Sequence, residues 1–91
     1  GAALWAGRGR LYGALREIPG VTVFPSRTNF LLLEVPEDRS DALFDAWRQA
    51  DILVKRYRGN PLLPGAFRIT VTTAAVDDEI LRVLKEVMSR A

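Results

Sequence analysis

The stretch Phe67-Arg68-Ile69-Thr70-Val71-Thr72 alternates apolar and polar side chains, which predicts a β-strand with two unlike faces. Its apolar side chains suit a protein core. On the other face, Arg68 is costly to bury unless an anion meets it, because an unpaired buried charge is strongly disfavoured. Its guanidinium is a planar fork of donors that suits a carboxylate or a phosphate. The strand by itself also allows a plainer interpretation, in which Arg68 lies flat on the surface and stays in water.

Around this strand the chain predicts three helices and three further strands. Helices are expected over residues 4–18, from a cap at Asp38 or Ser40 to about Ala50, and from about Ala75 onward. Strands are expected over residues 21–24, 29–35 and 52–57. With so few strands, the helices most simply cover one face of one sheet. We therefore expect a single domain over residues 1–91. Its fold class is α+β, with a small antiparallel or mixed sheet of three or four strands and helices on one face.

The two faces of this sheet are predicted to differ. Leucine on both faces of the strand over 29–35 predicts burial on both sides of that strand. The face away from the helices is expected to carry Arg68, Thr70 and Thr72, together with Leu53 and Lys55. A mixed face of this kind is either in contact with water or docked on something outside the chain.

Composition excludes several kinds of site. The chain has no cysteine and no histidine, which excludes disulfides, thiolate nucleophiles, the Ser-His triad and nearly all transition-metal sites. The acidic run at residues 77–79 could ligate a hard cation but suits the start of a helix better, so no metal site is predicted. No apolar run approaches the ~20 residues of a membrane helix, and no secretory signal is visible. We therefore expect a cytoplasmic protein with no membrane partner.

Charge and lysine content limit the function further. The net charge is +2, and the basic residues are scattered apart from a cluster of Lys55, Arg56 and Arg58 around Tyr57. A nucleic-acid partner is not expected, because such proteins usually show a denser basic face, although the cluster keeps a weak nucleic-acid binder as an alternative. Lys55 and Lys85 are the only lysines, and neither lies in the apolar pocket that activates a Schiff-base lysine. No catalytic or cofactor-binding residue is predicted.

Three segments resemble motifs of the fold-type I aminotransferases, in that family's order and spacing. Residues 25–33 (PSRTNFLLL) resemble its segment with a serine, an Asn-Phe pair and a hydrophobic run. Residues 50–55 (ADILVK) resemble its Gly-Ile-hydrophobic-Val-Arg strand, and residues 67–73 (FRITVTT) resemble its Leu-Arg-Ile-Thr-Val-Gly-Thr strand. The resemblance covers essentially the whole chain. It is greatest to the C-terminal small domain of the histidinol-phosphate aminotransferases.

The resemblance implies roles for individual residues. In that family the arginine at the position of Arg68 binds the substrate carboxylate and, in the histidinol-phosphate enzymes, helps to bind the phosphate. Lys55 stands where the family has a second anion-binding arginine, and Asn29 matches an asparagine that faces the domain junction. Strand alternation puts Lys55 and Arg56 on opposite faces, so only one of them can lie beside Arg68. Asp51 replaces a glycine at a helix end where left-handed backbone is expected.

The resemblance also implies a larger context. The chain would be part of a longer aminotransferase whose large domain holds pyridoxal phosphate and the lysine that binds it. Such an enzyme would act as a homodimer on a small anionic substrate, an amino acid or a phosphate ester. The expected activity is histidinol-phosphate (imidazole acetol-phosphate) transamination in histidine biosynthesis, and the chain alone would be inactive. A free-standing anion-binding or regulatory α+β domain remains the main alternative.

Overall fold

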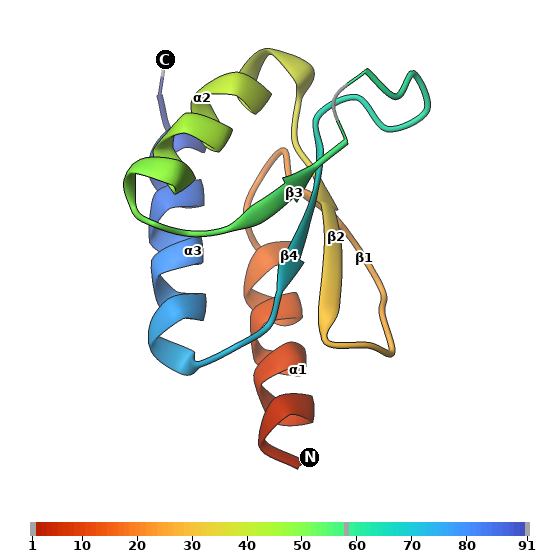
Figure 1. The fold of residues 1–91 in the computed structure, drawn as a ribbon, viewed down its shortest axis with the longest axis vertical. Helices are drawn as coiled ribbons and strands as arrows, with labels where there is room; N and C mark the ends of the chain where they lie inside the picture. The colour runs from red at the N-terminus through yellow and green to blue at the C-terminus, as the bar shows by residue number, and fades with distance from the viewer. Residues whose placement is uncertain (1, 58, 91) are drawn as a thin grey trace.

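A computed structural model describes residues 2–57 and 59–90, and it shows the predicted order of elements (Figure 1). The helices are α1 (Ala2–Arg16), α2 (Glu37–Gln49) and α3 (Ala74–Met88). The strands are β1 (Thr22–Phe24), β2 (Phe30–Glu34), β3 (Val54–Arg56) and β4 (Ala66–Thr70). The strands form one sheet in the order β1-β2-β4-β3, and every neighbouring pair is antiparallel. The predicted α+β class is therefore confirmed, with the sheet wholly antiparallel.

The hydrophobic core lies between the helices and one face of the sheet (Figure 1). Alternate residues of the central strands point into it, and all of them are almost fully buried: Leu31, Leu33, Phe67 and Ile69. Trp47 of α2 is completely buried and packs edge-on against Phe67, with the two ring centroids 5.2 Å apart. Its Nε1–H donates a hydrogen bond to the Ile80 carbonyl. This indole therefore joins α2, β4 and α3. The buried faces of α1 and α3 contribute Leu11, Leu15, Ile80, Leu84 and Val87.

The ends of the helices differ in part from the prediction. The expected cap of α2 at Asp38 or Ser40 is wrong, because the helix begins at Glu37 after Pro36 and has no side-chain cap. Pro36 has φ −53° and ψ 139°, so it lies just outside the helix, where its missing N–H leaves no helical hydrogen bond unmade. The last helix begins one residue earlier than expected and is capped by Thr73, whose side-chain oxygen accepts a hydrogen bond from the Val76 N–H at 3.2 Å. Asp51 has φ 59° after α2, which confirms the left-handed backbone expected there.

The prediction of burial on both faces of β2 is wrong. Leu31 and Leu33 are 1% and 0% exposed, whereas Leu32 between them is only half-buried and Phe30 is 36% exposed. The reason is the placement of the helices: among the described residues, they pack on one face of the sheet only (Figure 1). Nothing in this part of the chain covers the other face. Arg58, which the sequence places in a basic cluster, lies outside the described residues.

Candidate functional site

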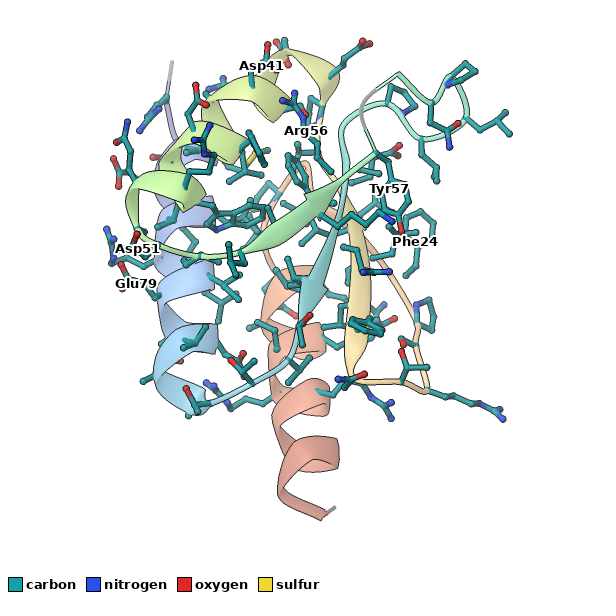
Figure 2. The ribbon with its side chains drawn as sticks, in the orientation of Figure 1. Phe24, Asp41, Asp51, Arg56, Tyr57 and Glu79 are labelled. Atoms are coloured by element: carbon teal, nitrogen blue, oxygen red, sulfur yellow. The ribbon has the colours of Figure 1, made fainter. Side chains whose placement is uncertain are left out.

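Four side chains lie in a row across the uncovered face of the sheet. Phe24 of β1 is directly opposite Leu32 of β2, Leu32 is opposite Arg68 of β4, and Arg68 is opposite Lys55 of β3. Because opposed residues on antiparallel strands share a face, all four point away from the helices. Phe30 and Tyr57 lie beside this row, and we call the six residues the open face. Figure 2 shows Phe24 and Tyr57 on the opposite side of the strands from α2.

Arg68 lies near the middle of the open face, with an aromatic ring as its neighbour. Its guanidinium carbon is 4.5 Å from the centroid of the Phe30 ring, and the side chain is half-buried. The Lys55 ammonium lies 5.8 Å from the centroid of the Tyr57 ring. Within residues 2–57 and 59–90, neither cation has a carboxylate within 4.0 Å. Two positive side chains therefore stand opposite each other, and no described carboxylate pairs with either of them.

Several arginines elsewhere in the fold are paired with carboxylates. The Arg10 guanidinium bonds the Asp78 carboxylate at 2.8 Å, Arg56 bonds Asp41, and Arg82 bonds Glu79. Like charges directly opposite each other on neighbouring strands destabilise a sheet. The pair of Arg68 and Lys55 is therefore unfavourable in the chain as it stands and would be relieved by a bound anion. This arrangement suits a carboxylate or a phosphate.

Arg56 lies on the other side of the sheet from Lys55, as strand alternation predicts. Its guanidinium donates to the Ser40 hydroxyl at 3.0 Å and pairs with Asp41, and it lies 5.2 Å from the centroid of the Phe44 ring. Figure 2 shows Arg56 beside Asp41 at the start of α2. A hollow of about 450 Å³ adjoins this pair, but its arginine is already neutralised. Of the two neighbouring cations, only Lys55 can act together with Arg68.

Asn29 is not part of the row on the open face. It precedes β2 and is exposed, and its carbonyl accepts a hydrogen bond from the Val71 N–H at 2.8 Å. This bond extends the pairing of β2 with β4 beyond Phe30. The structure therefore brings Arg68 and Lys55 together and places Asn29 at the end of the sheet. Its role at a domain junction stays a prediction.

Two of the three acidic residues at the start of α3 pair with α1. Asp77 is 0% exposed, and its carboxylate lies 3.8 Å from the Arg10 guanidinium of α1. Burial raises the pKa of Asp77, while the Thr72 backbone N–H and Arg10 act to lower it. Asp78 also pairs with Arg10, whereas Glu79 pairs with Arg82. Among the described residues, no three acidic side chains gather as a metal site would require.

Neither lysine is placed to anchor a carbonyl cofactor. Lys55 is exposed beside Tyr57, and Lys85 is exposed on α3. A lysine that forms a Schiff base needs a site that disfavours its charged form, and neither position is enclosed in that way. The residues of this chain therefore do not fit as the anchor of pyridoxal phosphate.

In the part of the chain that the structure describes, no helix is long and apolar enough to cross a membrane.

Comparison with known proteins shows the family of the chain. Residues 2–87 match the family model described as aminotransferase class I and II. The chain belongs to this family. One relative is the histidinol-phosphate aminotransferase of Methylibium petroleiphilum, which is 38% identical to this chain over 89 residues. The aligned residues make up 97% of this chain and 24% of that protein. The resemblance seen in the three sequence motifs is thus confirmed.

Solved structures of larger proteins contain the same fold. The histidinol-phosphate aminotransferase of Clostridium acetobutylicum superposes with a TM-score of 0.80 at 24% identity, over 96% of this chain and 27% of that one. A decarboxylase from Sulfurospirillum multivorans superposes with the same TM-score at 25% identity, over 92% of this chain and 25% of that one. The fold by itself therefore does not select transamination. The chain spans about a fifth to a quarter of the length of the curated relatives it matches.

The site contains one contact that the sequence did not reveal, which is the stacking of Arg68 on Phe30. The Asn-Phe pair of β2 is part of the family resemblance, but nothing in that motif shows where the ring lies. Phe30 is opposite Thr70, so it is the diagonal neighbour of Arg68 on the same face. Diagonal neighbours on antiparallel strands are within reach of aromatic and long side chains. The sequence indicated at most that Phe30 and Arg68 could share a face of the sheet. That the two side chains are in contact depends on the register of β2 with β4.

Proposed function

We propose that this chain is the C-terminal small domain of a pyridoxal-phosphate-dependent aminotransferase of the histidinol-phosphate type, and that Arg68 binds the anionic end of the substrate. The observation that carries the proposal is the pair of Arg68 and Lys55, which stand opposite each other on the open face with no carboxylate of the described residues within 4.0 Å of either. The family match supports the reaction class. The similarity to proteins named histidinol-phosphate aminotransferase supports the substrate.

Each of the two cations has a distinct task in this proposal. Arg68 presents two parallel N–H donors to a carboxylate or phosphate, and its strand is hydrogen-bonded on both sides, by β2 and by β3. Lys55 adds a point charge from the edge strand, without the geometry of a fork. Together they would hold the anionic end of the substrate in a fixed place, which lowers the entropic cost of aligning its amino group for reaction.

The remaining parts of the active site would come from a large domain of the same protein. Pyridoxal phosphate, when bound there, supplies the electron sink for amino transfer. We infer that the open face of this domain lies towards that site, because none of the described helices covers it. A cytoplasmic homodimer that acts in histidine biosynthesis is part of the same proposal and rests on the family resemblance.

Kinetics of the full-length protein test the proposal. Arg68→Ala should lower kcat/KM for histidinol phosphate by roughly tenfold or more, because a charge-assisted hydrogen bond contributes about 1.5–3 kcal/mol. Arg68→Lys should recover part of this loss, and Lys55→Ala should do less harm than Arg68→Ala, since lysine lacks the fork. Thermal unfolding measured in parallel separates lost binding from lost folding.

The same experiment separates the proposal from its main alternative. Near-normal kcat/KM for Arg68→Ala would contradict the role of Arg68, as would a loss of activity that simply follows a loss of folding. If Arg68 instead binds inorganic phosphate without any effect on transamination, the result would support a regulatory anion-binding domain.

A further inference from the structure

The ring of Phe30 lies against the guanidinium of Arg68. The ring centroid is 4.5 Å from the guanidinium carbon, well inside the ~6 Å range of a cation–π contact. In the other cation–ring contacts of the described residues, the distance from the cation to the ring centroid is longer, between 5.2 and 5.9 Å. The contact is therefore the strongest candidate for a group that controls the position of Arg68.

The chemistry of stacking leaves the binding edge of the guanidinium free. A ring attracts the flat face of the cation, whereas a carboxylate or phosphate bonds to the N–H groups in the guanidinium plane. A carboxylate partner such as Asp41, which bonds Arg56, would occupy those N–H groups and neutralise the charge. Phe30 does neither. It can restrict the rotamers of a long side chain without competing with the ligand.

We propose that Phe30 is a positioning residue, which holds the Arg68 guanidinium with its N–H edge presented to the substrate anion. This inference rests on the proposed function, because it assigns Phe30 a role through Arg68. The effect would appear in substrate binding: an unrestrained arginine must lose rotamer freedom when the anion binds, and a stacked arginine has already lost part of it.

The test uses the full-length protein with histidinol phosphate as amino donor and 2-oxoglutarate as acceptor. Phe30→Leu keeps apolar bulk and removes the ring, and it should raise KM for histidinol phosphate about three- to tenfold with kcat within twofold of wild type. Phe30→Tyr keeps the ring and should restore KM. Phe30→Met replaces Phe30→Leu if that variant unfolds.

Tyr12→Leu is a matched control. Tyr12 is a partly buried residue of α1 outside the open face, and its ring also lies against an arginine, with the Arg16 guanidinium carbon 5.6 Å from the ring centroid. This variant should keep KM for histidinol phosphate within twofold of wild type. An equal rise in KM for Tyr12→Leu and Phe30→Leu would overturn the positioning role, since it would reflect the loss of any aromatic ring of the domain.

Combining the substitutions separates positioning from direct contact with the substrate. In the Arg68→Ala background, Phe30→Leu should leave KM unchanged, because the group that it positions is absent. A further rise in KM in that background would overturn the inference and would mean that Phe30 acts without Arg68. If Arg68→Ala lowers kcat/KM but Phe30→Leu does nothing, only the role of Phe30 is wrong. If Arg68→Ala itself has no effect, the proposed function is wrong, and the role of Phe30 falls with it.

Discussion

Two adjacent leucines of β2 should respond very differently to truncation. Leu33 is 0% exposed and points into the core, so Leu33→Ala should cost about 2–5 kcal/mol, which includes the cavity that it leaves. Leu32 is half-buried on the open face, so its truncation opens to solvent and leaves no closed cavity. Leu32→Ala removes three carbons, each worth ~0.8 kcal/mol when fully buried. Because Leu32 is only half-buried, about half of that total applies, and the expected loss is roughly 1 kcal/mol.

Urea unfolding of the chain, followed by circular dichroism and tryptophan fluorescence, measures both values. In thermal scans, each kcal/mol corresponds to about 4–8 °C for a domain of this size, so Leu32→Ala should shift the midpoint by roughly 5 °C and Leu33→Ala by roughly 10 °C or more. Equal losses at the two positions would refute the reasoning. They would mean that the assignment of the two faces of β2 is wrong, or that the chain itself covers the open face.

The same pair of substitutions in the full-length protein reports on the open face. If a large domain packs against that face, as we propose, Leu32 is better covered there than in the chain alone. The difference between the losses of unfolding free energy caused by Leu32→Ala and by Leu33→Ala should then be smaller than in the chain alone. An unchanged difference would indicate that the open face at Leu32 remains in water in the full-length protein.

Two further predictions concern the titratable groups. Burial raises the pKa of Asp77 above its ordinary value of 3.8, so the folded state keeps the carboxyl proton to higher pH than the unfolded chain does. The free energy of unfolding should therefore fall as the pH rises from 3.8 through the pKa of the folded state. Over this pH range, Asp77→Asn should therefore become more stable relative to wild type, even though the substitution removes a negative charge that faces Arg10. Urea unfolding curves measured at a series of pH values test this. A difference in stability that does not change with pH would contradict the prediction. The chain alone should form no stable, stoichiometric lysine adduct with pyridoxal phosphate by absorbance or mass spectrometry, and such an adduct at Lys55 or Lys85 would contradict our account of the cofactor anchor.

Local patterns in the sequence determined the order of the elements and the face on which Arg68 lies. The alternation from Phe67 to Val71 is a period of two residues, and it places Arg68 opposite the core side without reference to any other strand. By the same parity, Lys55 and Arg56 had to lie on opposite faces, as they do. Gly59, Pro61, Pro64 and Gly65 marked the loop between β3 and β4, because glycine and proline suit turns rather than strands.

Contacts between distant segments were decided by the tertiary structure. A run of leucines does not show which side a helix will cover, so the half-exposure of Leu32 follows only from the packing of α1, α2 and α3 on one face. The stacking of Phe30 on Arg68 depends on the register of β2 with β4. The pairing of Asp77 with Arg10 depends on how α1 meets α3. Each of these contacts joins residues far apart in the chain, and no local periodicity contains that information.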